Sequence, residues 1–267
     1  MFKIDIHTHI LPENLNEVTN SFSDPRFLHM ELIDDQSAML KKDGGAFRKV
    51  NCNCWNHQKR IQECDTARVD VQVLSTIPVL FSYWAKDDEG LMLSRFLNDH
   101  IAKVVRNTPK RFIGLGTVPM QNIDLAIEEM DRCITKLNLP GIEIGSNVNG
   151  RNLSEAEFQP IFEHAEKIGC AIFVHPWEMM GQADMQKYWL PWLVGCLLKY
   201  PGRSVQLYLA EYLKNFLHSK LPLPTGVALS HLRLAALTTA SMSALTSVPL
   251  TMKNCPHPIR NISMWIH

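Results

Sequence analysis

The sequence lacks an excess of charge of either sign, since 27 Lys and Arg residues balance 27 Asp and Glu residues. Without net charge, the chain has no long-range electrostatic attraction to nucleic acid or to an anionic membrane. No run reads as a membrane span either, because the apolar-leaning stretch 226–250 contains His231, Arg233 and many Ser and Thr residues. We therefore expect a small-molecule substrate, and neither a nucleic acid nor a membrane as partner.

Cysteine is scarce and irregularly spaced. The seven cysteines are odd in number, and Cys52-Asn53-Cys54 has no second thiol pair that would complete a metal site. The N-terminal segment MFKIDIHTHI carries Asp5 where a secretory signal would have an apolar region. These features predict a reducing, cytosolic location.

Acidic residues almost disappear after residue 195. From Cys196 to His267 there are seven Lys and Arg residues against the single acid Glu211, whereas residues 1–195 carry 20 basic and 26 acidic residues. The alternation of strand and helix patterns fails at the same point. We therefore predict two regions: residues 1–195 as a folded domain, and residues 196–267 as an unrelated tail.

Up to residue 195, strand-like and helix-like patterns alternate. Strands are expected at 2–6, 69–76, 112–119, 141–145 and 170–174, and helices at 58–67, 89–107, 122–137 and 154–168, the last capped by Ser154. Between the first strand and residue 56 lies a long polar insert without a sustained period, with a turn signal at Asp43-Gly44-Gly45. Short connections between alternating elements indicate an α/β protein with a parallel sheet.

No glycine occurs in His7-Thr8-His9-Ile10-Leu11-Pro12, the loop that follows the first strand. A doubly wound nucleotide-binding sheet would need a glycine-rich loop there. We therefore predict a TIM-type barrel of the metal-dependent hydrolase kind, truncated after about five of its eight strands. Such a barrel would have two open edges and an uncovered interior, which predicts marginal stability or aggregation.

His7 and His9 are separated by one residue at the end of the first strand, so their side chains share one face and can converge on an ion. With 11 histidines, chance alone predicts roughly 0.4 pairs at this spacing. Their place at the end of a barrel strand favours metal binding over ordinary surface or core histidines. His175 follows the last predicted strand and is the candidate third ligand, with a hydrogen-bonded structural role as its alternative.

Arg48 lies in the long insert, where its guanidinium could hold a substrate carboxylate; a solvated surface charge is the alternative. Aromatic residues cluster near predicted strand ends and loops. They could line an apolar pocket, although core packing explains them nearly as well. They are Trp55, Tyr83, Trp84, Trp177, Trp189 and Trp192.

Five segments resemble the aminocarboxymuconate-semialdehyde decarboxylase family of the amidohydrolase superfamily. They are DIHTHILP (5–12), LSTIPVLFSYWAK (74–86), FIGLGTVPMQ (112–121), FVHPW (173–177) and YWLPWLVG (188–195). The resemblance covers about the first 195 residues. It implies a cytosolic, homodimeric zinc enzyme of tryptophan (kynurenine) degradation that decarboxylates 2-amino-3-carboxymuconate 6-semialdehyde and so limits quinolinate and NAD formation.

By the same resemblance, His7, His9 and His175 match zinc ligands, Arg48 matches an arginine that holds a substrate carboxylate, and Trp189 and Trp192 match pocket aromatics. The family also has a proton-transfer histidine in an Ala-His-Gly-Gly-Gly motif and a late aspartate at the metal. Neither is present, since the last aspartate is Asp184 and no His-Gly-Gly occurs. We therefore assign no catalytic residue.

When the possible codons for Pro224–Leu229 are read from one base earlier, they permit the sequence Ala-His-Gly-Gly-Gly-Ala, which is the missing family motif. The codons for residues 196–199 and 210–216, read in the same shifted frame, also permit sequences like those of the family. We therefore hypothesise a frameshift directly after Gly195. Two alternatives to an active decarboxylase remain: a metal-dependent amidohydrolase, and an inactive variant that pairs with intact subunits.

Overall fold

The computed structural model describes residues 2–178, 234–235 and 263–264. Its largest sheet is parallel, with strands in the order β11-β10-β7-β6-β5-β1-β12. The long strands are β1 (Lys3–His9), β5 (Val71–Ser75), β6 (Phe112–Thr117), β7 (Gly141–Gly145) and β10 (Ala171–His175). All of them lie where the sequence predicts strands. β1 continues past its predicted end at Ile6 and includes both His7 and His9.

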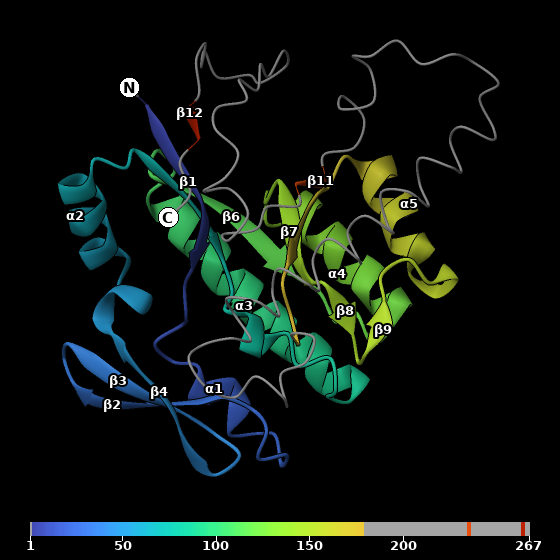
Figure 1. Ribbon diagram of the computed structural model, residues 1–267, viewed down its shortest axis with the longest axis horizontal. Helices are drawn as coiled ribbons and strands as arrows, with labels where there is room; N and C mark the ends of the chain where they lie inside the picture. Colours follow the sequence, from blue (N-terminus) through green and yellow to red (C-terminus); the bar gives the residue numbers. More distant parts are fainter. Residues whose placement is uncertain (1, 179–233, 236–262, 265–267) are drawn as a thin grey trace.

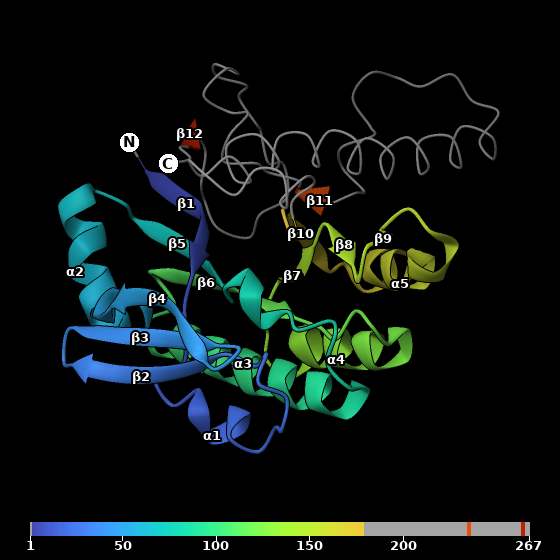
Figure 2. The same cartoon turned by 60° about the horizontal axis from the view of Figure 1, so that its bottom comes forward.

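The order of these long strands distinguishes the two α/β architectures. β1, β5, β6, β7 and β10 follow one another across the sheet in chain order, whereas a doubly wound sheet reverses its order in the middle. The sheet is curled, and α3, α4 and α5 cover its outer face (Figures 1 and 2). The predicted TIM-type barrel, truncated after about five strands, is thereby confirmed as a curled half-barrel.

The longer helices of the described part are α2 (His57–Ala67), α3 (Asp87–Asn107), α4 (Ile123–Thr135) and α5 (Gln159–Ile168). Asn56 and Asn122 cap α2 and α4: the Asn56 side chain accepts hydrogen bonds from the N–H groups of Gln58 and Lys59, and the Asn122 side chain accepts one from Leu125. The Ser154 cap predicted for α5 is wrong. The chain first forms a 3₁₀ turn, η3 (Ala156–Phe158), and α5 then begins with Pro160 in its first turn, where a missing N–H costs no hydrogen bond.

The main core lies between the sheet and helices α3, α4 and α5. The helices approach β6 very closely: a Cβ added at Gly116 would lie 2.5 Å from Cys133 Sγ, and one at Gly114 would lie 2.6 Å from Ile101 Cγ2. Glycine is therefore required at both positions, because any side chain there would push α3 or α4 off the sheet.

The long insert, whose sequence shows no sustained period, contains a short helix and three strands. After the short helix α1 (Asn16–Thr19), β2 (His29–Asp34), β3 (Ser37–Lys42) and β4 (Gly45–Asn51) form an antiparallel sheet. The predicted turn joins β3 to β4, with Asp43 and Gly44 both at positive φ, as a tight hairpin turn requires. Alternation is obscured in the sequence because β4 is mostly exposed and because two adjacent residues of β3, Ser37 and Ala38, are both buried.

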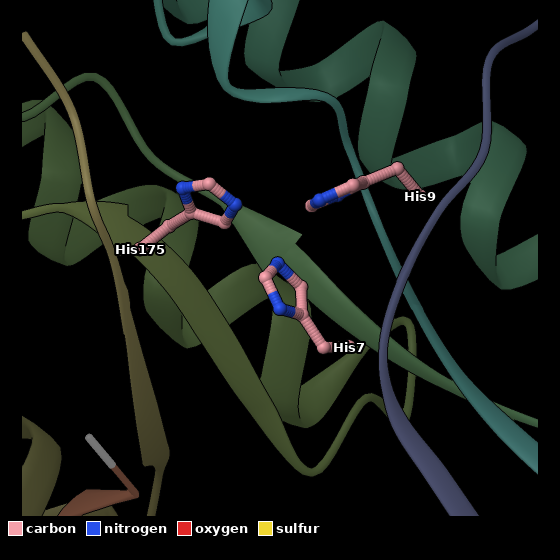
Figure 3. A group of neighbouring side chains, drawn as sticks. All are labelled: His7, His9 and His175. Atoms are coloured by element: carbon pink, nitrogen blue, oxygen red, sulfur yellow. The ribbon is translucent and has the colours of Figure 1, made fainter. Parts of the chain in front are cut away.

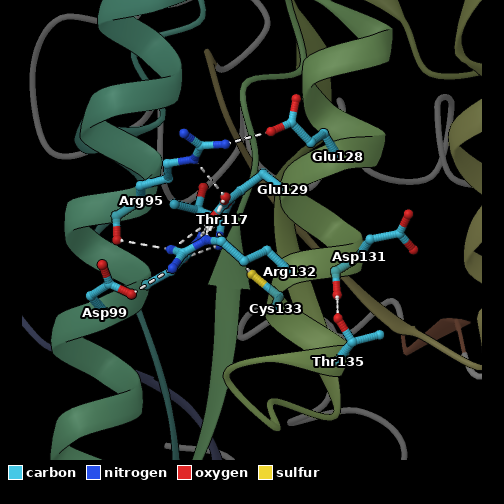
Figure 4. A network of polar contacts seen from close by, with 10 residues as sticks. Arg95, Asp99, Thr117, Glu128, Glu129, Asp131, Arg132, Cys133 and Thr135 are labelled. Atoms are coloured by element: carbon cyan, nitrogen blue, oxygen red, sulfur yellow. Dashed lines mark hydrogen bonds and ion pairs between the residues drawn. The ribbon is translucent and has the colours of Figure 1, made fainter.

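A buried carboxylate ties α3 to α4 (Figure 4). Glu129 has no exposed side-chain surface and accepts hydrogen bonds from Arg95, Arg132 and Asn98. Asn98 also bonds both the N–H and the carbonyl of Thr117 on β6. This network joins two helices to the sheet and satisfies a charge that would be costly if left alone.

Several short elements complete the described part: the 3₁₀ turns η1 (Cys52–Cys54) and η2 (Pro78–Leu80), and the strands β8 (Asn147–Val148) and β9 (Arg151–Asn152). No helix among the described residues is long and apolar enough to cross a membrane. The two-residue strand β11 (Leu234–Ala235) pairs with β10, and the two-residue strand β12 (Ser263–Met264) pairs with β1. These are the two sheet edges that the sequence predicted to be open. The rest of the tail lies outside the described residues, so the boundary at residue 195 stays a prediction.

Candidate metal centre

The structure brings together the three histidines that the sequence singled out. One ring nitrogen from each of His7, His9 and His175 lies within 4.8 Å of the others. Their ring centroids are 5.0 Å apart for His7 and His9, 4.8 Å for His7 and His175, and 5.1 Å for His9 and His175. Figure 3 shows the imidazoles pointing toward one common point. They come from the carboxyl ends of β1 and β10, the edge of a parallel barrel where sites are found.

Backbone carbonyls determine which nitrogen faces that point. Nδ1 of His9 lies 2.9 Å from the carbonyl oxygen of Thr76, and Nδ1 of His175 lies 2.7 Å from that of Pro176. A carbonyl oxygen only accepts hydrogen bonds, so each neutral imidazole must carry its proton on Nδ1. The Nε2 lone pairs of both residues are then available to a metal ion, as is usual for histidine ligands.

Burial keeps these imidazoles neutral. Desolvation lowers the pKa of His175 to about 3, and it lowers the pKa of His9 well below its usual value; neighbouring histidines add to both shifts. The pKa of His7 is also lowered by burial, against the opposing charge of Asp5. Three neutral imidazoles that converge on one point are a donor set suited to a zinc ion. The residues present therefore fit a metal of this kind.

Side chains around the end of β1 hold its backbone in place. Arg60 on α2 donates to the carbonyl oxygen of His9 at 2.7 Å and to that of Asn53 at 3.1 Å. Asp5 accepts a hydrogen bond from the backbone N–H of His7 at 3.3 Å and one from Gln72 at 3.2 Å. The main chain of His9 is thus attached directly to α2, and that of His7 is linked to β5 through the Asp5 side chain.

Two polar residues beside the cluster were missed from the sequence. Ser75, at the end of β5, lies 3.1 Å from Nδ1 of His9 and donates to Oε1 of Glu143, 3.0 Å away. Glu143 belongs to β7 and is completely buried, and burial raises its pKa well above the usual value. Its position as the only acid in the predicted apolar strand 141–145 was a signal that could have identified it.

Aromatic rings lie beside two of the histidines, whereas Tyr83 and Trp177 pack in or against the main core, so a place for these two in a pocket wall stays a prediction. Phe173 contacts His7, with ring centroids 5.4 Å apart, and Phe81 lies 6.5 Å from His175 and 5.8 Å from Trp177. Tyr83 stacks on Phe81 and accepts a hydrogen bond from the N–H of Gly145. These rings desolvate one side of the cluster.

Other predicted site residues lie elsewhere. Trp55 and Trp84 pack in the core beneath the insert, which supports the core-packing alternative for these two. Arg48 lies on β4 opposite Leu40 with an exposed side chain, and its carboxylate-binding role stays a prediction. Trp189 and Trp192 lie outside the described residues.

The chain is similar in sequence to known proteins over most of its length. The profile of a family described as amidohydrolase matches residues 4–212. The chain is 52% identical over 193 residues to 2-amino-3-carboxymuconate-6-semialdehyde decarboxylase from Dictyostelium discoideum, a match that covers 72% of this chain and 54% of that protein. It is 31% identical to the Caenorhabditis elegans protein of the same name, over 80% of this chain and 65% of that one. The chain thus spans between half and two thirds of the length of these relatives.

Solved structures share the fold. A 5-carboxyvanillate decarboxylase from Sphingomonas paucimobilis has a TM-score of 0.62 at 21% identity, covering 80% of this chain and 64% of that chain. A dihydroxybenzoic acid decarboxylase from Polaromonas, crystallised with manganese and 2-nitroresorcinol, has a TM-score of 0.52 at 18% identity, covering 71% of this chain and 54% of that chain. At these identities the likeness concerns the fold alone.

Proposed function

Because the chain belongs to the amidohydrolase family, we propose that residues 2–178 form the metal-binding half of a decarboxylase that acts on 2-amino-3-carboxymuconate 6-semialdehyde. The observation that carries the proposal is the convergence of His7, His9 and His175 at the carboxyl ends of β1 and β10. The two curated relatives, which are named as this decarboxylase, support the choice of substrate.

We assign the metal as zinc, held by His7, His9 and His175, because neutral imidazole nitrogens suit this ion. Manganese in a structural neighbour makes it the alternative ion. When bound, the dication supplies an activated water and stabilises the anionic species from which carbon dioxide leaves.

The chain's own residues would bind and orient the substrate. Phe81, Tyr83 and Trp177 exclude water from one side of the cluster, which strengthens electrostatic interactions with a charged substrate. Arg48 would hold a substrate carboxylate with its planar guanidinium. Trp189 and Trp192 would add pocket walls.

The finer biological setting follows from the family resemblance. In this proposal the protein acts in the cytosol as a homodimer and removes a precursor of quinolinate in tryptophan degradation, so that less NAD is formed by that route. Sedimentation equilibrium of the purified chain tests the dimer, and a purely monomeric protein would exclude it.

A second candidate is a chain that binds metal but has little or no activity of its own and pairs with intact subunits. It is favoured by the absence of any aspartate after Asp184 and of any His-Gly-Gly sequence. A frameshift after Gly195 accounts for both absences. Sequencing the transcript across that codon tests it, and an in-frame transcript that encodes this tail would exclude the frameshift.

The activity test uses the purified chain loaded with zinc and follows loss of the semialdehyde's absorbance. Turnover that His7→Ala abolishes supports the decarboxylase. The matched control is His164→Ala, because His164 is bonded to Asp131 and lies outside the cluster. Metal binding that depends on His7, without turnover, supports the second candidate. Absence of both contradicts the proposed centre.

A further inference from the structure

Glu143 is buried inside the half-barrel in an arrangement that stability alone does not explain. The side chain has no exposed surface, and its Oε2 atom has no hydrogen-bond partner among the described residues. Leaving a buried polar atom without a hydrogen-bond partner lowers the stability of the folded state. An apolar residue of similar size at this position of β7 would avoid that cost.

The paired oxygen of Glu143 lies beside His9, on the side of the ring that faces away from the candidate ion. Oε1 accepts a hydrogen bond from the Ser75 hydroxyl at 3.0 Å and lies 3.9 Å from Nδ1 of His9. The carbonyl oxygen of Thr8 is the other acceptor within reach of that hydroxyl, at 3.2 Å. Oε1 of Glu143 is the closer of the two acceptors, so the hydroxyl donates to Glu143.

Donation toward Glu143 fixes the direction of the next hydrogen bond. The Ser75 hydroxyl has one hydrogen, so toward His9 its oxygen acts as an acceptor. The N–H of His9 at Nδ1 is thus shared between the Ser75 hydroxyl at 3.1 Å and the Thr76 carbonyl at 2.9 Å. Both acceptors lie on the side of the ring opposite to Nε2.

We propose that Glu143, acting through the Ser75 hydroxyl, is a positioning residue of the metal centre that holds the His9 imidazole with Nε2 toward the ion. Glu143 acts on the ligand from behind and does not itself bind the ion. This assignment rests on the proposed metal centre. Partners of this kind typically contribute about 10–100-fold to metal affinity.

The test measures cobalt(II) and zinc affinity of the full chain by competition with a chromophoric chelator, together with the visible spectrum of the cobalt form. Glu143→Leu and Ser75→Ala each lose about tenfold in affinity, with a shifted cobalt band. The double variant loses no more than either single variant, because both changes interrupt the same chain of hydrogen bonds. Glu143→Gln keeps an acceptor for Ser75 and stays within about threefold of the unmodified protein.

Thermal unfolding separates positioning from simple stability. Glu143→Leu removes an unpaired buried polar atom, so its melting temperature does not fall although its metal affinity does. The matched control is Glu129→Gln, another fully buried carboxylate, which lies in the network between α3 and α4. It lowers the melting temperature and leaves metal affinity unchanged.

Two outcomes overturn the assignment. If the unmodified chain binds metal through His7 but Glu143→Leu and Ser75→Ala bind it equally well, the positioning role is wrong and the metal centre stands. If the unmodified chain shows no metal binding that His7→Ala removes, the proposed centre fails and the positioning role fails with it.

Discussion

The imidazoles of His7 and His175 lie with their ring centroids 4.8 Å apart, although β1 and β10 are at opposite ends of the five long strands. Neighbouring strands are about 4.8 Å apart, so a flat sheet would separate these two strands by roughly 19 Å. The rings meet because the sheet is curled. An ion held by both residues would therefore connect the two ends of the half-barrel.

We predict that zinc raises the melting temperature of the chain. A ligand that binds only the folded state adds about 4 kcal/mol of stability at a free concentration 1,000 times its dissociation constant. Differential scanning fluorimetry with zinc and with a chelator measures the shift. His175→Ala should abolish it and His164→Ala should retain it; an equal shift in both variants would exclude this origin.

Replacing Arg60 should weaken metal binding from outside the cluster. Its guanidinium bonds the carbonyl oxygens of His9 and Asn53, so Arg60→Ala releases the end of β1 and leaves two carbonyls without this donor. We expect about 1–3 kcal/mol lower stability and about tenfold weaker zinc binding. Arg60→Lys should restore little, because an ammonium cannot reproduce the planar fork. Full recovery in the lysine variant would contradict this explanation.

His100 should make the protein less stable in acid. Burial, together with the positive charges of His57 and Lys103, lowers the pKa of His100 to about 4 from the usual 6.5. The unfolded chain therefore binds a proton that the folded chain resists, so stability present above pH 6.5 is lost as the pH falls toward 4. Urea unfolding of His100→Gln between pH 7 and pH 5 should show a smaller loss than the unmodified protein. Parallel profiles would argue against a role for this residue.

The network around Glu129 should contribute strongly to stability. Arg132 bonds Glu129 within α4 and Asp99 on α3. Arg132→Ala leaves a fully buried carboxylate with fewer partners, and we expect a loss of about 3–5 kcal/mol. Asp99→Ala removes only the exposed partner and should cost no more than about 1 kcal/mol. Equal losses in the two variants, measured by urea unfolding, would contradict this order.

The elements with a clear period were predictable from local sequence. The β-branched run at β5 and the helical spacing of α3 have their counterparts in the structure within a few residues. The insert was not predictable in this way, because its strands are half-exposed and carry charged residues such as Arg48 and Lys49 between apolar ones. Only contact with the core beneath the insert makes Ala38 and Leu40 a buried face.

By itself, the sequence determined the half-barrel, the placement of His7 and His9 on one face of β1, and the choice of His175 as their partner. These follow from local periodicity and from residue types at strand ends, which need no knowledge of distant contacts. The tertiary structure decided which ring nitrogens face the common point and which buried groups stand behind them. Ser75, Glu143 and Arg60 meet His9 across four different elements, and such contacts depend on the curl of the sheet and not on any local pattern.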